Sequence, residues 1–264
     1  MKNIYICNNE NEESVSTAAR LKTLLKAKGF SLYDSFTPDI DFVISIGGDG
    51  AFLRTLQKMN YADVPVLGLK TGHLGFFCEL SGLDNETVLD ILENGNYTVQ
   101  RHRTIECHVQ CRNRESLLEP ALNDILIKKD NSSMMHLKLY IGNSYIENFS
   151  GDGLLIASSA GSTAYNYSLG GSIVDPRLDL LQITPVAPAN NAIYRSFTSS
   201  LLAPPDQVIT IESEDIKNAV VIADGMEKHF SDVDRISICL SDKQIQIVRL
   251  PSYDFWGKVK SKFL

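Results

Sequence analysis

The 264-residue chain carries 25 Lys and Arg against 32 Asp and Glu, a net charge of −7, and neither sign forms a long block; this argues against a nucleic-acid-binding protein, because such proteins usually present a basic surface to phosphates. Its five cysteines are odd in number and lack the spacing of a secreted disulfide framework, so we expect reduced thiols and a cytoplasmic location. The apolar runs are strand-sized and the first residues lack a signal-peptide core, so we expect neither export nor a membrane span.

The first hundred residues alternate short apolar strands with helical stretches, a pattern typical of a parallel sheet with crossover helices. Strands are predicted over residues 3–7, 30–33, 42–46 and 66–69. A first helix is predicted between the acidic residues Glu10, Glu12 and Glu13 and the closing Gly29. Two more are predicted over 51–59 and over 86–92, and Gly95 should stop the last one. The first helix should bury Val15, Ala18, Leu21 and Leu25 on one face. We therefore expect an α/β domain over residues 1–98.

After Tyr97 apolar and polar residues alternate and hairpin signals appear, which predicts an antiparallel β-rich domain over residues 99–250. The predicted strands cover residues 104–111, 121–128, 207–212, 219–223, 235–240 and 244–250, with a hairpin over 137–148 folded about Gly142-Asn143. Residues 251–264 should form a helix that packs back on the α/β domain through Phe255, Trp256, Val259 and Phe263.

The motif Gly47-Gly48-Asp49-Gly50 follows the strand over 42–46 and precedes a helix. Open α/β sheets bind ligands at this carboxyl end, where glycines and a helix start direct N–H groups toward a phosphate. A carboxylate there would repel phosphate, so Asp49 should have a task of its own, such as accepting a proton. The alternative, on this pattern alone, is an ordinary tight turn with Asp49 as the helix N-cap.

Asn123-Asp124 interrupts the strand-like run over residues 121–128. These residue types are poor strand formers, and an amide beside a carboxylate can bind the neighbouring hydroxyls of a ribose. A solvent-facing bulge or turn explains the pair at least as well when it is taken alone.

A third group of polar and small residues spans Gly151-Asp152-Gly153 and residues 158–171. Small side chains leave room for a ligand, and Tyr165 offers a ring for stacking. The alternative is a packing interface between helix and sheet, but so many hydroxyl and amide groups would then need partners. We expect a ligand to supply some of those partners.

Other candidates carry less weight. Asp224-Gly225 is, taken alone, a hairpin turn. Strand alternation puts Cys107 and Cys111 on one face and His108 on the other, so a zinc site is disfavoured. Neither a P-loop nor a spaced dinucleotide fingerprint occurs.

The motifs together resemble the NAD kinase family. The resemblance rests on Gly47-Gly48-Asp49-Gly50, Thr71-Gly72-His73-Leu74-Gly75-Phe76, Asn123-Asp124, Gly151-Asp152-Gly153 and Gly161-Ser162-Thr163-Ala164-Tyr165, in this order. The first motif is shared with diacylglycerol-kinase-like and phosphofructokinase-like enzymes, and the later ones select among them. The resemblance implies a Rossmann-like α/β domain, a C-terminal antiparallel β-rich domain and a homotetramer. It also implies phosphorylation of the adenosine-ribose 2′-hydroxyl of NAD to give NADP, with Mg²⁺ and ATP or another polyphosphate.

The resemblance assigns roles to individual positions of this chain. Asp49 matches the general base, and Gly47, Gly48 and Gly50 match the phosphate loop, with Gly50 beside the NAD diphosphate. Asn123, Asp124 and Asp224 match the residues around the ribose, and Asp152 matches a carboxylate that meets dinucleotide in the oligomer. The remaining matches are to pocket-lining positions: Phe76, Ser162, Thr163, Ala164, Tyr165, Ser168 and the backbone of Ala187. No residue matches a protein ligand for a metal.

The chain departs from the family pattern at two places. Ala51 stands where Thr is usual, and Ser158-Ser159-Ala160 replaces a stretch that usually contains Thr and Pro. The loss of the Thr hydroxyl motivates one alternative, a sensor that binds NAD or NADP without turnover. A diacylglycerol-type lipid kinase is the other, although Asn123-Asp124 argues against it.

Overall fold

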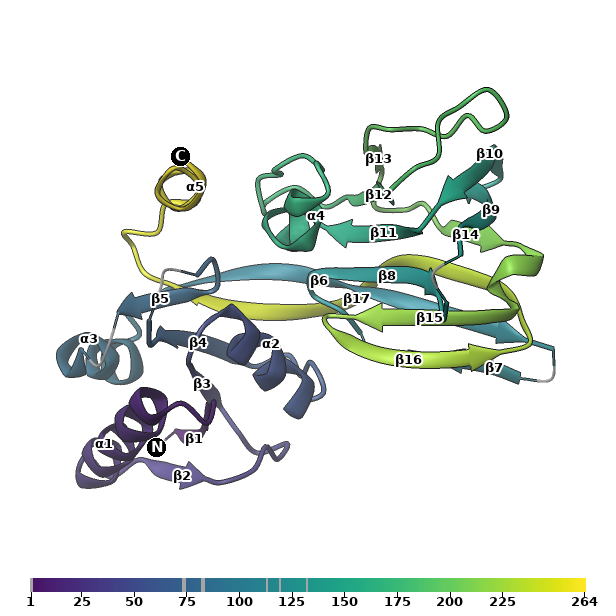
Figure 1. The fold of residues 1–264 in the computed structure, drawn as a ribbon. Helices are drawn as coiled ribbons and strands as arrows, with labels where there is room; N and C mark the ends of the chain where they lie inside the picture. The colour runs from purple at the N-terminus through teal and green to yellow at the C-terminus, as the bar shows by residue number, and fades with distance from the viewer. Residues whose placement is uncertain (1, 73–74, 82–83, 113, 119, 132) are drawn as a thin grey trace. The chain divides into compact units, whose positions relative to one another are not determined.

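The computed structural model describes residues 2–72, 75–81, 84–112, 114–118, 120–131 and 133–264, so His73 and Leu74 of the predicted loop motif lie outside the described residues. The chain forms two compact units: residues 1–101 with 244–264, and residues 102–243. It passes between them along β6 (Thr98–Cys111) and β17 (Val233–Arg249) (Figure 1). None of the helices in the described part is long and apolar enough to cross a membrane.

The first unit contains a parallel sheet. Its order is the end of β17, β4 (Pro65–Lys70), β3 (Phe42–Ile46), β1 (Asn3–Asn8) and β2 (Ser31–Tyr33), with β5 (Cys78–Ser81) also beside β4. All five residues of β3 are buried, as a strand covered on both faces requires. The parallel arrangement confirms the predicted sheet and puts the carboxyl ends of β1, β3 and β4 at one edge.

The helices of the first unit agree with the prediction in kind but differ in detail. In α1 (Glu12–Ala27) Ala18, Leu21 and Leu25 are buried, whereas Val15 is 48 % exposed, so that part of the predicted face is wrong. Ser14 is buried instead, and its hydroxyl has a hydrogen-bond partner in the Thr71 hydroxyl at 2.6 Å. The third predicted helix is a short α3 (Asn85–Leu89) continued by a π-helix, η1 (Asp90–Asn94), which ends at Gly95 in the left-handed conformation.

The second unit consists of antiparallel strands in two layers around one core. One layer has the order β13 (Leu201–Ala203), β12 (Leu181–Val186), β11 (Gly153–Ser158), β8 (Asp124–Lys129), β15 (Asn218–Ala223) and β16 (Met226–Ser231). The other contains β10 (Ser144–Gly151), β9 (Met135–Ile141), β14 (Ile209–Glu212) and β17, with β6 beside β17 and β7 (Arg114–Leu117) beside β6. The β9–β10 hairpin about Gly142-Asn143 confirms that prediction.

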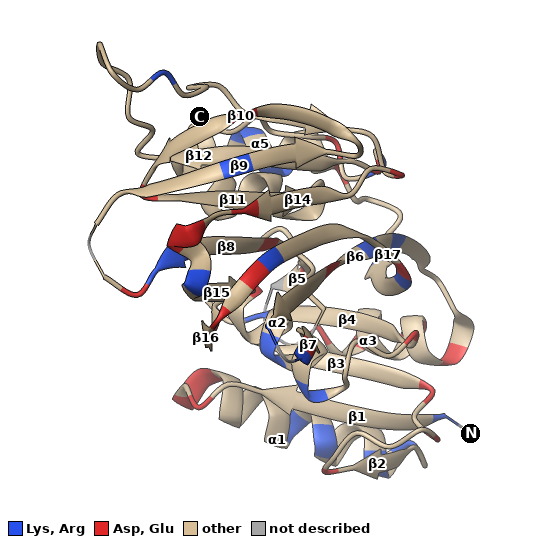
Figure 2. Cartoon of the chain, turned by 90° about the vertical axis from the view of Figure 1, so that its right-hand side faces the viewer, with Lys and Arg blue, Asp and Glu red and all other residues tan. Residues whose placement is uncertain are grey.

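Two predicted strands, over 235–240 and 244–250, form one continuous strand, β17. The helical turns of the second unit are η2 (Ala160–Thr163), α4 (Tyr165–Ser168) and η3 (Glu214–Lys217). Charges of both signs are interspersed over the elements of each unit, as the sequence suggested (Figure 2).

The C-terminal helix, α5 (Phe255–Phe263), belongs to the first unit. Phe255 and Val259 are buried, whereas Trp256 is 51 % exposed and does not help to anchor the helix. The rings of Phe255 and Phe263 lie 6.0 and 5.7 Å from that of Phe76.

Candidate functional site

The first cluster of predicted site residues, which we call the glycine corner, comprises residues 47–50 and 75–77 of the first unit. Gly47 has φ +143° and donates its N–H to the carbonyl of Leu69 at 2.9 Å, which joins the ends of β3 and β4. A Cβ on Gly47 would lie 2.6 Å from the Cβ of Ala51. Both the backbone conformation and the space therefore require glycine at this position.

Asp49 is the first residue of α2 (Asp49–Lys58), and Gly48 is the N-cap, so the alternative in which Asp49 caps the helix is wrong. The Asp49 carboxylate instead accepts the N–H groups of Phe76 at 2.9 Å and Phe77 at 3.1 Å. A Cβ on Gly75 would lie 2.1 Å from Oδ1. The side chain keeps 25 % of its surface exposed. The carboxylate is thus held on one side and open to solvent on the other.

The segment that holds Asp49 is itself held by a buried charge network. Glu79 pairs with Arg249 at 2.6 Å and with Lys258 of α5 at 2.9 Å. Lys258 also donates to the carbonyls of Phe76 and Cys78, and Arg249 donates to Phe76 O. Glu79 and Arg249 are 3 and 4 % exposed, so removing one partner would leave a buried charge unpaired. The sequence analysis missed these three residues; charges inside otherwise apolar segments were the available signal.

Phe76 is 7 % exposed, and its ring packs against α5. The resemblance implies that it forms part of a nucleotide-pocket wall. In the folded unit most of its surface already contacts protein, whereas its backbone N–H reaches Asp49.

The second cluster, the polar corner, comprises residues 122–124, 158–161 and 224 of the second unit. Asp224 has φ +46° in the two-residue turn between β15 and β16, so the hairpin interpretation is confirmed. Its carboxylate also accepts the N–H groups of Leu122 at 2.7 Å, Asn123 at 2.8 Å and Asp124 at 3.3 Å. One side chain therefore fixes the backbone at the start of β8.

Asn123 and Asp124 are not a solvent-facing bulge. Asn123 is 7 % exposed, and within the described residues its Oδ1 has no hydrogen-bond partner although it is buried. Burial, and secondly the charge of Asp224, raise the pKa of Asp124 to about 7. An unpaired buried acceptor beside a carboxyl group that is near its titration point at neutral pH is an arrangement that a polar ligand would complete.

The small residues of 158–161 allow their backbone to lie close to the backbone of residues 122 and 123. A Cβ on Gly161 would lie 2.0 Å from the carbonyl oxygen of Asn123. The Ser158 hydroxyl donates to Leu122 O, and the Gly161 N–H donates to the Ser158 hydroxyl. Ser162 is fully buried, and its hydroxyl bonds to the backbone of Val174. The protein itself therefore supplies partners for the hydroxyls of Ser158 and Ser162, and these two need no ligand.

Comparison with known proteins identifies the family. A family model for the ATP-NAD kinase N-terminal domain matches residues 33–97, and one for the ATP-NAD kinase C-terminal domain matches residues 122–250. The NAD kinase of Finegoldia magna is 37 % identical over 268 aligned positions, which cover 99 % of this chain and 97 % of that protein. The chain belongs to the NAD kinase family. The NAD kinase of Lactobacillus acidophilus is 32 % identical, again over 99 % of this chain and 97 % of its own length.

Solved structures of an NADH kinase and an NAD kinase share the fold. A yeast NADH kinase complexed with NADH superposes with a TM-score of 0.82 at 20 % identity, covering 98 % of this chain and 86 % of that one. An NAD kinase from Archaeoglobus fulgidus in complex with ATP gives 0.77 at 24 % identity, covering 98 and 99 %. Membership of this family leaves no support for the lipid-kinase alternative.

The remaining positions that the resemblance assigns to the site fall in two places of the second unit. Thr163 and Ala164 are partly buried, while Tyr165, which is 45 % exposed, and Ser168 face solvent. Asp152 and Ala187, both exposed, flank the end of β11 where Gly153 pairs with Val186. Asp124 pairs at the other end, with Ala157, so about 13 Å of strand separates the two groups.

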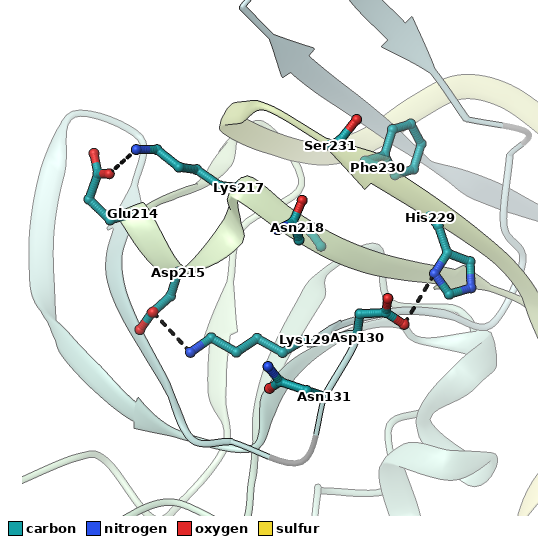
Figure 3. Close-up of a pocket in the computed structure, with 11 residues that line it drawn as sticks. Lys129, Asp130, Asn131, Glu214, Asp215, Lys217, Asn218, His229, Phe230 and Ser231 are labelled. Carbon is teal, nitrogen blue, oxygen red and sulfur yellow. Dashed lines mark ion pairs between the residues drawn. The ribbon is translucent and has the colours of Figure 1, made fainter.

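Two cavities among the described residues of the second unit lie away from the predicted residues. One of about 560 Å³ is lined by Lys129, Asp215 and His229 among others, and one of about 1040 Å³ lies beside β9 and β10. Figure 3 shows that charges in the first pair with each other: Lys129 with Asp215, Lys217 with Glu214, and His229 with Asp130. Because the buried acceptor lies in the polar corner, that corner is the stronger candidate.

The cysteines of β6 follow the strand interpretation. Cys107 and Cys111 are buried, and His108 points away and pairs with Glu115. Across the described ranges, no group of three His, Cys, Asp or Glu side chains is arranged to hold a metal ion.

Proposed function

We propose that the chain transfers the terminal phosphoryl group of ATP, or of another polyphosphate, to the adenosine-ribose 2′-hydroxyl of NAD and so forms NADP. The observation that carries the proposal is the Asn123-Asp124 pair, with its unpaired buried amide oxygen and its carboxyl group of raised pKa. Ribose hydroxyls both donate and accept hydrogen bonds, and this pair offers both functions at neutral pH. Membership of the NAD kinase family supports the same substrate.

We assign the acceptor side to the second unit. Asp224 holds the backbone of residues 122–124, so that the two side chains are preorganised for the ribose. The exposed ring of Tyr165 provides a stacking surface for a base. Ser162, Thr163, Ala164 and Ser168 belong to the same segment and complete the proposed pocket. Ser162 would contribute by packing, since its hydroxyl is occupied.

We assign proton transfer to Asp49. A ribose hydroxyl is a poor nucleophile at neutral pH, and a carboxylate about 2.6–3.2 Å from it can accept its proton as the O–P bond forms. The bond from the terminal phosphorus to the bridging oxygen breaks, and ADP leaves with the electron pair. Backbone N–H groups of Gly48 and Gly50 are proposed to bind phosphate at the start of α2. The Gly47 N–H already donates to Leu69 O, so Gly47 contributes the backbone conformation of the turn.

A magnesium ion bound to the donor would neutralise phosphate charge. The glycine corner offers backbone groups and one carboxylate, a donor set too small to hold the ion alone and suited to an ion that keeps phosphate and water ligands. The chain's own task at this point is to orient the donor and to receive the proton.

Asp152 and Ala187 suggest a role for a second copy. In one chain they lie at the opposite end of β11 from Asp124. We propose that they face dinucleotide bound by a neighbouring copy in a homotetramer.

A cytoplasmic location is supported by the five cysteines, all of which are free thiols. The domain division at residues 98 and 99 also remains a proposal.

The proposal is tested by incubating the purified protein with NAD and Mg²⁺-ATP and detecting NADP with an NADP-specific dehydrogenase. Asp49→Asn should lower kcat by about 10²- to 10⁴-fold, because a general base contributes that much, while NAD binding stays within twofold. Asp63→Asn is the matched control: its carboxylate is 61 % exposed and pairs with Arg101 on the surface of the same unit.

The outcomes separate the alternatives. Full turnover in Asp49→Asn would reject Asp49 as the base but leave the reaction intact. NAD binding without NADP formation by the unaltered protein would favour the sensor alternative. If NADP forms but Asn123→Ala leaves the KM for NAD unchanged, the acceptor site is misplaced.

A further inference from the structure

A lysine near the C-terminus lies beside the proposed base. Lys262, in the last turn of α5, places its ammonium nitrogen 3.8 Å from Asp49 Oδ2 and 4.7 Å from the centre of the Phe76 ring. About 36 % of the Lys262 side chain is exposed. All three residues belong to the first unit.

The position of this ammonium is fixed by the helix that carries it. Lys258 lies one turn earlier on the same face, since positions four apart in a helix are neighbours. The Lys258 ammonium donates hydrogen bonds to Phe76 O, Cys78 O and the Glu79 carboxylate. The rings of Phe255 and Phe263 pack on Phe76 as well. The helix is therefore anchored to the same segment that holds Asp49.

Lys262 differs from Lys258 in how its ammonium is used. Within the described residues the Lys262 ammonium makes no hydrogen bond, and its single ion pair, at 3.8 Å, is longer than one. A partly exposed ion pair of this length contributes little to stability, so folding alone does not account for the placement. Three N–H groups remain available beside the loop.

The chemistry of the site gives those N–H groups a partner. The hydroxyl that Asp49 deprotonates lies within about 3 Å of the carboxylate, and the phosphorus it attacks lies about 3–3.5 Å beyond. The oxygens of that phosphoryl group are therefore within reach of an ammonium that sits 3.8 Å from the carboxylate. A cation here would also offset the repulsion between Asp49 and the incoming phosphate.

We propose that Lys262 is a catalytic residue that donates hydrogen bonds to the oxygens of the phosphoryl group in transfer. The inference rests on the proposed function of Asp49. Lys262 stays protonated throughout; the proton of the 2′-hydroxyl goes to Asp49, and the electron pair of the broken O–P bond leaves with ADP.

The test compares Lys262→Gln, Lys262→Arg and the unaltered chain in steady-state kinetics with NAD and Mg²⁺-ATP. Lys262→Gln should lower kcat/KM for ATP about ten- to hundredfold, the size expected for a lost hydrogen bond to a charged group, with an unchanged KM for NAD. Lys262→Arg should recover most of the loss, because it keeps the charge and the donors. Lys260→Gln, on an exposed position of the same helix, is the matched control and should behave as the unaltered chain.

Two results would overturn the inference. One is a Lys262→Gln variant whose kcat/KM for ATP is within twofold of the unaltered chain. The other is a loss confined to a displaced pH profile of kcat with an unchanged KM for ATP, which would mean that the ammonium acts only through Asp49. Failure of the unaltered chain to form NADP would instead reject the proposed function, so the two failures are distinguishable.

Discussion

The glycine corner of the first unit and the polar corner of the second are each organised by one carboxylate that accepts backbone N–H groups. Asp49 accepts two, from Phe76 and Phe77, and Asp224 accepts three, from residues 122–124. In each corner a glycine lies so close to other atoms that an added Cβ would clash, but the atoms differ. Gly75 faces the tip of the Asp49 side chain, whereas Gly161 faces the backbone oxygen of Asn123. A side chain can rotate away from an added methyl group and a strand backbone cannot, so the two corners should respond differently to the same substitution.

Gly161→Ala should have the largest effect on stability. The new Cβ would lie 2.0 Å from Asn123 O, and the start of β8 is fixed by Asp224, so the strand cannot move away cheaply. We expect a loss of about 3 kcal/mol in the free energy of unfolding, as for overpacked cores. Urea unfolding followed by circular dichroism measures it. Gly257→Ala in α5, where the methyl meets only the end of the Asp254 side chain, is the control; equal midpoints for the two variants would contradict this account.

Asp124→Asn should change how stability depends on pH. The pKa of Asp124 is about 7 in the folded chain against 3.8 unfolded, so the folded state holds more protons between these values and stability falls as pH rises through that window. The variant lacks this titration. Its stability relative to the unaltered chain should rise by about 2 kcal/mol from pH 5 to pH 7. Parallel pH profiles of the urea midpoint would show that Asp124 is not the group responsible.

Gly75→Ala should separate activity from stability. The methyl would displace the Asp49 carboxylate, whose Oδ1 lies 2.1 Å from the added Cβ position, and so disturb the proposed base. We expect kcat to fall about tenfold or more, since small misplacements of a catalytic group are costly, with less than about 1 kcal/mol lost in stability. Kinetics and unfolding of one preparation decide the matter. A large loss of stability with a normal kcat in the folded fraction would contradict this expectation, because Gly75 would then matter for folding and not for the position of Asp49.

Ala51→Thr should have the smallest effect. Ala51 is 5 % exposed in the first turn of α2, next to the loop. A hydroxyl there would donate one hydrogen bond to phosphate or accept one from a backbone N–H group, so kcat/KM for ATP should rise about two- to fivefold. Ala51→Val adds similar bulk without the hydroxyl and is the control. If Ala51→Val and Ala51→Thr change kcat/KM for ATP equally, the added bulk near Gly47 and not the hydroxyl is responsible.

The sequence predicted some elements residue by residue and misjudged others for identifiable reasons. The continuous apolar run of β3 gave its bounds directly, because a strand buried on both faces needs no alternation. The predicted strands over 235–240 and 244–250 left residues 241–243 between them, yet these residues lie inside β17. Arg103 donates to Leu240 O and Ser241 O, and Thr104 to Lys243 O, so side chains of a neighbouring strand keep that segment extended. Those contacts are invisible to a local pattern.

The sequence by itself determined the parallel sheet, the glycine-rich turn after β3, the β9–β10 hairpin and the order of motifs that resembles the NAD kinase family. Local periodicity and turn chemistry suffice for these features, since each depends on residues close together in the chain. Only the tertiary structure decided what the motifs touch. The partners of Asp49 are 27 and 28 positions away, and those of Asp224 are 100 to 102 positions away. Hydrogen bonds over such separations follow from how strands and helices pack, so the ammonium of Lys262 beside Asp49 became apparent only in the folded chain.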